Sequence, residues 1–226
     1  MLIALDTETT GVDMFHGATP FAVSTCDKKG RTRFWEWPVD PHTRQVMAPE
    51  EDLQELVDYI DGSKLIFHNI KFDVKALRTL GIRIVFEGYE WASAPYDDHK
   101  FEAVVEGFED TLLASHVCNS AEPHGLKYLA DKYVGIMDDD EEELLEAVRA
   151  ARRAAKSKGW TLGEALSNVS SVYCDYWLPK AVDPSSEVLE TYAVQDVVRT
   201  MLLWIMYRAV MKDEKLRDHY ETRKNL

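Results

Sequence analysis

The chain has 226 residues, of which 46% are hydrophobic and 11% aromatic, and its 26 Lys and Arg against 40 Asp and Glu give a net charge of −14. This apolar content is enough to build a buried core, which excludes a disordered chain. The negative charge argues against a surface coated with cations for nucleic acid or anionic lipid.

The first part of the chain predicts a strand followed by a β-hairpin. Residues 1–10 begin as a short apolar run that turns acidic at its end, as a buried strand does when it delivers side chains to a site. Residues 21–27 and 31–37 are β-prone runs joined by Lys28-Lys29-Gly30, which is typical of a hairpin.

A helix, a strand and a second helix follow. Apolar residues in 49–60 recur at spacings of three and four, and Gly62 ends this predicted helix. Residues 64–68 form the next predicted strand, and a helix through 74–80 ends at Gly81. This order predicts an α/β layer with mixed strand directions.

The second half of the chain predicts mainly helices. Residues 89–108 have no clean period and are expected to form a loop or local insertion. Helices are predicted at 109–117, 125–133, 138–158 and from about Ser186 to about Met211. Asp183-Pro184 resembles a helix cap followed by a first-turn proline.

Asp6-Thr7-Glu8 places two carboxylates on one face of the first strand, because side chains at i and i+2 of a strand point the same way. Two clustered carboxylates repel and raise each other's pKa unless a cation lies between them. The pattern therefore indicates a site for a hard divalent metal. A lone Asp-x-Glu is also compatible with a solvated strand end.

Two further segments carry candidate site residues. His68-Asn69-Ile70-Lys71-Phe72-Asp73 runs from a strand end through a turn into a helix. In Tyr192-Ala193-Val194-Gln195-Asp196, the phenol and the carboxylate lie one turn apart on the inward face of the long helix. An inward Asp needs a metal or a partner, for which Arg199 is a candidate. Tyr192 alone could be an ordinary tyrosine at the edge of the core.

Together these segments resemble the three motifs of the DEDD superfamily of 3′ to 5′ exonucleases, in its tyrosine variant (DEDDy). The matching segments, in the order of the motifs, are Asp6 to Gly11, Asn69 to Asp73 and Tyr192 to Asp196. The histidine variant would need an imidazole near position 191, which is Thr191. The resemblance implies an α/β, RNase H-like fold with a central mixed five-stranded sheet flanked by helices.

The resemblance also implies a site. The expected ligands of two Mg²⁺ or Mn²⁺ ions are Asp6, Glu8, Asp73 and Asp196. Tyr192 completes the catalytic set and is expected to orient the attacking water. The expected substrate-binding residues are Thr7, Thr9, Asn69 and Phe72. Asp110 is a fifth candidate carboxylate, for which we favour a helix N-cap or a supporting role over metal ligation, and Asn69 could also cap a helix.

Other segments resemble the proofreading domain of family A DNA polymerases, especially those of phages, more than RNase D or oligoribonuclease. They are residues 109–114, 124–127 and 192–198. This resemblance implies release of nucleoside 5′-monophosphates from single-stranded or frayed 3′ ends of DNA, with a polymerase module or subunit as partner. The alternatives are an RNA 3′ exonuclease of RNase D type and a catalytically silent module that binds nucleic acid or a polymerase.

The expected exonuclease domain covers residues 1–212, with insertions near 89–108 and 138–160, and 213–226 is a charged C-terminal tail or the start of a linker to a polymerase module. The acidic run 138–143 is expected to lie away from the cleft. Four cations share one helical face, which either contacts DNA or a polymerase or is simply solvated: Arg149, Arg152, Arg153 and Lys156. We expect a weak grip on DNA, strong metal dependence and reliance on a partner.

The cysteines and the apolar runs predict a reduced, soluble protein. Cys26, Cys118 and Cys174 are widely spaced and form no Cys-x-x-Cys pair. The N-terminal apolar run meets Asp6 too early for a signal peptide, and the longest apolar run, 201–207, is too short to cross a bilayer. We therefore expect a cytoplasmic location, in a bacterium or in the host of a phage, and no membrane partner.

Overall fold

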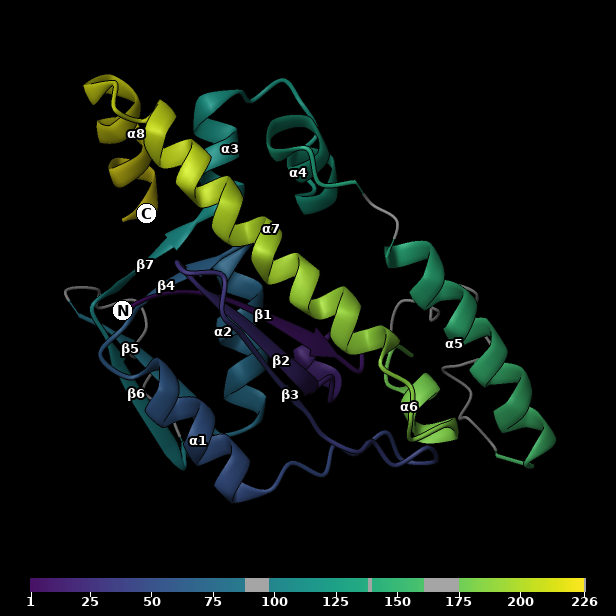
Figure 1. Ribbon diagram of the computed structural model, residues 1–226. Helices are drawn as coiled ribbons and strands as arrows, with labels where there is room; N and C mark the ends of the chain where they lie inside the picture. Colours follow the sequence, from purple (N-terminus) through teal and green to yellow (C-terminus); the bar gives the residue numbers. More distant parts are fainter. Residues whose placement is uncertain (88–97, 138–139, 161–174, 226) are drawn as a thin grey trace.

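A five-stranded mixed sheet lies at the centre of the computed structural model, which describes residues 1–87, 98–137, 140–160 and 175–225 (Figure 1). In sheet order the strands are β3 (Thr32–Glu36), β2 (Pro20–Asp27), β1 (Leu2–Thr9), β4 (Lys64–Phe67) and β7 (Gly107–Asp110). The hairpin pairs β1, β2 and β3 antiparallel, whereas β4 and β7 run parallel to β1. The predicted fold class and the predicted hairpin are confirmed.

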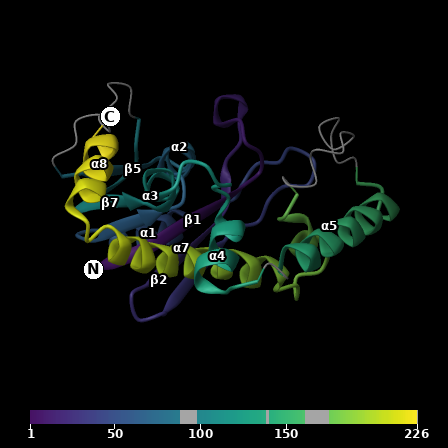
Figure 2. The same cartoon turned by 90° about the horizontal axis from the view of Figure 1, so that it is seen from above.

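Helices cover both faces of this sheet. The helices against one face are α1 (Glu50–Ile60) and α2 (Ile70–Thr79), and those on the other are α3 (Thr111–Cys118), α4 (Leu126–Val134) and α7 (Val188–Val210). The long α7 crosses the sheet diagonally and contacts β1, β2, β3 and β4 (Figure 1). α5 (Asp140–Ser157) and α6 (Leu178–Val182) lie at the end where α7 begins, and α5 extends away from the sheet (Figure 2).

The segment 89–108 corrects one prediction. Within its described part, Phe101–Val105 forms β6, which pairs parallel with β5 (Ile82–Phe86), and Gly107 begins β7. Buried and exposed residues alternate along β6, and its buried side chains join the core beneath α1. The loop prediction was therefore wrong from 101 onward, because five residues are too few to make a two-residue period stand out. Residues 88–97 lie outside the described part.

The two ends of α7 bring further corrections. Asp183 does not begin a helix: it is the C-terminal cap of α6 and accepts hydrogen bonds from Ser185, whereas α7 begins at Val188 without a side-chain cap. The segment 213–226, predicted as a charged tail or linker, contains α8 (Glu214–Lys224), which packs against α3. Asp213 caps α8 by accepting from the backbone of the first turn. None of the helices in the described ranges has the length and hydropathy of a membrane span.

Tyr220 anchors α8 to the edge strand β7. Its side chain is 1% exposed, and its hydroxyl donates to Glu109 Oε2 at 2.9 Å and accepts from the Asp110 N–H at 2.9 Å. Lys224 Nζ lies 3.4 Å from the same Glu109 oxygen. Polar contacts of Tyr220 therefore hold α8 in place, and the hydrophobic pattern of this charged segment does not predict them.

We expect Tyr220→Phe to lower the free energy of unfolding by about 1–3 kcal/mol, because a buried carboxylate and a buried N–H lose a hydrogen-bond partner. Urea denaturation measures this change. Tyr128→Phe, which changes a tyrosine that is 42% exposed on α4, is the matched control and should change stability far less. Equal stabilities of the two variants would contradict the anchoring role of Tyr220.

Candidate active site

Asp6 and Glu8 lie on the face of β1 that α7 covers. Ile3 belongs to the core beneath α1 and α2, whereas Ala4 belongs to the core beneath α7. Because side chains alternate along a strand, Asp6 and Glu8 share the side of Ala4. Asp196 of α7 meets them there, and one carboxylate oxygen from each of the three lies within 4.8 Å of the other two.

Asp73 reaches the same region from α2. It is 2% exposed, and its Oδ1 accepts from the Thr7 N–H at 3.1 Å and from the Thr7 hydroxyl at 2.8 Å. Thr7 alternates with Asp6 and Glu8 and therefore points to the α2 side of the strand. Its hydroxyl, expected to contact substrate, is used in the structure to hold Asp73 against β1.

The four carboxylates repel one another, with Asp73 and Asp196 buried and Asp6 and Glu8 half-buried. Burial raises the pKa of Asp6 well above its usual range, and the neighbouring Asp73, Glu8 and Asp196 raise it further. Burial likewise raises the pKa of Glu8 to about 8 and that of Asp73 to about 8. Hard divalent cations are bound by oxygen ligands and would relieve this repulsion, so the donor set fits Mg²⁺ or Mn²⁺.

The sequence left open whether Asp196 faces a metal site or pairs with Arg199, and in the structure it takes part in both the carboxylate cluster and a salt bridge. It faces the carboxylate cluster, and it also accepts a hydrogen bond from Arg199 Nη1 at 2.8 Å. Burial raises the pKa of Asp196 to about 6, against the opposing charges of Lys127 and Arg199. A salt bridge and a place in the cluster therefore coexist, because a carboxylate has two oxygens.

Arg199 ties the acidic start of α5 to the site. Its side chain is 1% exposed and donates to both oxygens of Asp140, at 2.6 and 2.8 Å. Glu141 accepts from Lys127 at 3.0 Å. The expectation that the acidic run lies away from the cleft was therefore wrong for these two residues, because they pair with the buried Arg199 and the half-buried Lys127 beside the cluster. Residues 138 and 139 lie outside the described part.

Lys127 is a site residue that the sequence reasoning did not single out. Its Nζ lies 4.2 Å from the centre of the Tyr192 ring, and its charge lowers the pKa of both Glu8 and Asp196. The residue stands in the segment 124–127, whose resemblance to polymerases was the one available signal. Only the packing of α4 on α7 reveals which of those side chains faces the cluster.

Tyr192 contacts both Lys127 and a second aromatic ring. It is 9% exposed, and its ring centre lies 5.4 Å from that of Tyr176 in an edge-on arrangement. Burial raises the pKa of Tyr192, and the charges of Glu8 and Asp196 raise it further. The phenol therefore stays protonated at neutral pH and can donate a hydrogen bond but cannot act as a base.

Asp110 caps two helices at once. Its carboxylate accepts from the backbone N–H groups of Asn69 and Ile70 at the start of α2, at 3.3 and 2.9 Å. It also accepts from Leu112 and Leu113 at the start of α3, at 2.8 and 3.1 Å. Four N–H donors occupy its oxygens, which agrees with the N-cap role favoured over metal ligation.

The remaining predicted substrate residues lie around the cluster. Asn69 occupies the N-cap position of α2 with a left-handed backbone (φ 86°), but its side chain makes no capping hydrogen bond and Asp110 supplies the acceptor instead. Thr9 follows an irregularity in the pairing of β1 with β2, and its hydroxyl donates to the Gly11 carbonyl at 2.6 Å. Phe72 is half-buried on α2 and lines a groove next to Asn69.

The basic face of α5 is partly used in the fold. Arg152 donates to the buried Asp175, which also pairs with Arg44 at 2.9 Å. Arg149, Arg153 and Lys156 are exposed. Three of the four predicted cations are therefore exposed and available to a partner or to solvent, and Arg152 is used within the fold.

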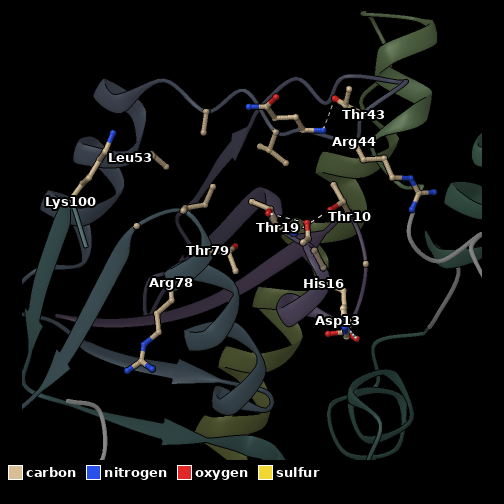
Figure 3. Close-up of a pocket in the computed structure, with 18 of the residues that line it drawn as sticks. Thr10, Asp13, His16, Thr19, Thr43, Arg44, Leu53, Arg78, Thr79 and Lys100 are labelled. Carbon is tan, nitrogen blue, oxygen red and sulfur yellow. Dashed lines mark hydrogen bonds and ion pairs between the residues drawn. The ribbon is translucent and has the colours of Figure 1, made fainter. Parts of the chain in front are cut away.

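A cleft of about 990 Å³ opens beside the end of β1 (Figure 3). Among the described residues that line it, none is a carboxylate of the cluster. Its cations are already paired, as in the contacts of Arg44 with Asp175 at 2.9 Å and of Lys100 with Glu50 at 2.8 Å. The carboxylate cluster, rather than this larger hollow, therefore has the features of a reactive site.

We expect the metal-free protein to lose stability relative to a Glu8→Gln variant as the pH rises from about 4.5 to about 8. Glu8 has a pKa of 4.5 when unfolded and of about 8 in the fold, so the folded state binds the proton more tightly. Its contribution is therefore complete below the lower value and is lost by the upper one. Melting temperatures of both proteins in EDTA across this range measure the difference, and Mg²⁺ should restore the wild type at the alkaline end. A difference that is independent of pH would contradict this prediction.

Comparison with known proteins places the chain among nucleases. A family model described as a 3′-5′ exonuclease matches residues 2–206. The DNA polymerase DpoZ of Salmonella phage PMBT28 is 30% identical over 82 residues, which are 36% of this chain and only 12% of that polymerase. The chain therefore matches a small part of this curated relative.

Solved structures share the fold at low sequence identity. A structure described as the apo form of a nuclease has a TM-score of 0.56 and 18% identity, covering 99% of this chain and 79% of the other. NrnC of Brucella melitensis with bound Mg²⁺ has a TM-score of 0.55 and 16% identity, with the same coverage. At these identities the likeness shows a common fold.

Proposed function

The chain belongs to the 3′-5′ exonuclease family, and from this premise we propose that it removes nucleoside 5′-monophosphates from the 3′ ends of DNA with the help of two divalent cations. The observation that carries the proposal is the grouping of Asp6, Glu8 and Asp196 within 4.8 Å, with Asp73 held beside them by Thr7. A cluster of carboxylates this close together fits a reaction on a phosphodiester better than a passive binding role.

Four carboxylates would hold the cations. They come from three elements of the fold: Asp6, Glu8, Asp73 and Asp196. When bound, the cations supply Lewis acidity at the scissile phosphate. The protein contributes the fixed geometry, because Thr7 holds Asp73, Arg199 holds Asp196, and β1 fixes the other two.

Tyr192 is proposed to position the attacking water. A phenol that remains protonated donates a hydrogen bond to an oxygen in a fixed place and leaves proton removal to other groups. Lys127 and Tyr176 both contact its ring and limit its rotation. We therefore assign Tyr192 an orienting role and Lys127 a role in placing Tyr192.

DNA is the proposed substrate because the curated relative is a phage DNA polymerase. A proofreading role follows from the same relative, with a polymerase module or subunit as the partner that brings a single-stranded or frayed 3′ end to the site. The place of action would then be the cytoplasm of a bacterial cell. RNA as a substrate is the competing possibility, and no described contact favours it.

Degradation of single strands labelled at either end tests the proposal. With Mg²⁺ or Mn²⁺, 5′-labelled DNA should shorten stepwise, 3′-labelled DNA should release its label at once as a mononucleotide, and EDTA should stop both. Matched RNA strands should be degraded more slowly. Early release of the 5′ label would contradict the direction, preferred degradation of RNA would contradict the substrate, and activity in EDTA would contradict the metals.

A further inference from the structure

We propose that a groove beside the carboxylate cluster binds the single-stranded DNA that precedes the reacting 3′ end, with Phe15 stacking on a base and Lys71 and Lys75 contacting phosphates. This inference rests on the proposed function and extends it to the residues that grip the strand. Phe15 lies outside the predicted exonuclease motifs. The two lysines lie on the exposed side of α2.

The groove has a volume of about 480 Å³ and lies between the turn at 12–15 and the first two turns of α2. Its lining residues are Val12, Asp13, Met14, Phe15, Asn69, Lys71, Phe72 and Lys75. One wall continues from β1, which carries Asp6 and Glu8, and the other belongs to the helix that carries Asp73. Two of the elements that carry the cluster therefore lead directly into the walls of this groove.

Phe15 is presented to solvent on a turn with defined geometry. Its side chain is 90% exposed, and Val12 beside it is 79% exposed. Asp13 fixes the turn by accepting from the Phe15 N–H at 3.1 Å and by pairing with His16 Nδ1 at 2.5 Å; both residues are labelled in Figure 3. Gly17 ends the turn with a φ of +94°. An aromatic ring held outward in this way is a ready stacking surface for a base.

Lys71 and Lys75 form a cationic edge on the opposite wall. They lie four residues apart on α2, so they share one face of the helix, and both are exposed. Neither forms an ion pair with any residue in the described ranges, whereas Lys64, Lys100 and Lys180 each pair with a carboxylate. The acid in the groove, Asp13, contacts the Phe15 N–H and His16 Nδ1 and forms no ion pair with either lysine in the described ranges.

A nucleic-acid strand fits this surface better than a protein segment does. Exposed aromatic side chains combined with cations along one groove are the usual means of holding single strands without regard to sequence. In a chain of net charge −14, two lysines that form no ion pair in the described ranges, on the helix that carries Asp73, also counteract the repulsion that the cluster exerts on phosphates. The weak DNA binding expected from the net charge would thus come mainly from this groove.

Binding of a 5′-labelled oligothymidylate, followed by fluorescence anisotropy with Ca²⁺ in place of Mg²⁺, tests the groove. Phe15→Ala should raise the Kd about tenfold, because stacking on an aromatic ring contributes substantially per base. The double variant Lys71→Ala/Lys75→Ala should reduce the slope of log Kd against log salt concentration by about 1.4, or about 0.7 for each lost phosphate contact. Melting temperatures should confirm that both variants are folded.

Lys28→Ala/Lys29→Ala is the matched control, because it removes the same charge from the exposed turn between β2 and β3. It should leave the Kd and the salt slope as in the wild type. The groove would be overturned if Phe15→Ala and Lys71→Ala/Lys75→Ala bound like this control. A wild-type protein that binds DNA through these residues but degrades neither DNA nor RNA with Mg²⁺ would support the groove and overturn the proposed function. Failure of the groove proposal can therefore be told apart from failure of the exonuclease proposal.

Discussion

Asp6→Asn is expected to reduce the degradation of single-stranded DNA by on the order of 10³-fold or more while leaving the protein folded. Asp6 belongs to the group of three carboxylates within 4.8 Å and is the residue whose pKa is raised by burial and by all three neighbouring acids. Replacing it removes one ligand from the centre of the cluster. The rate of shortening of a 5′-labelled strand with Mg²⁺ measures the effect.

The stability of the same variant separates loss of chemistry from loss of fold. Asn has nearly the size of Asp and carries no charge, so it relieves repulsion in the metal-free cluster. The melting temperature in EDTA at about pH 8 should therefore equal or exceed that of the wild type. Asp58→Asn, at an exposed position on α1, is the control and should keep full activity. Normal degradation by Asp6→Asn would mean that the site lies elsewhere.

Asp110→Ala is expected to lower the free energy of unfolding by about 2–4 kcal/mol, because one substitution removes the N-caps of α2 and α3 together. The four N–H groups that Asp110 accepts from lose their acceptor, and two of them, at Asn69 and Ile70, begin the helix that carries Asp73. Activity should fall along with stability, since Asp73 is no longer held in place. Urea denaturation and degradation assays on one preparation measure both.

Asp213→Ala provides a matched comparison for that prediction. Asp213 caps a single helix, α8, at an exposed position, so its removal should cost about 1 kcal/mol or less and leave activity unchanged. If Asp110→Ala lost activity with full stability, Asp110 would be a metal ligand rather than a cap. If Asp110→Ala lost no more stability than Asp213→Ala, the capping of two helices by Asp110 would not contribute to the stability of the fold.

The elements that could be predicted from the sequence are those whose pattern is local. A period of three to four residues marks α1 and α2, two β-prone runs joined by a turn mark the hairpin, and a long apolar segment marks α7. β6 and α8 do not, because β6 has only five residues and α8 is mostly charged and packs through Tyr220 and Lys224. Their burial depends on partners far away in the chain.

The candidate site divides in the same way. The sequence by itself determined the family, now confirmed by the family match over residues 2–206, and the carboxylates that share β1, because alternation along a strand follows from backbone geometry alone. Only the tertiary structure decided that Lys127 faces Tyr192, that Arg199 draws Asp140 to the cluster, and that Asp110 caps two helices. Apart from the local cap of α3, these contacts join residues that are 40 to 65 positions apart, so they depend on how helices pack across the sheet, which no local period encodes.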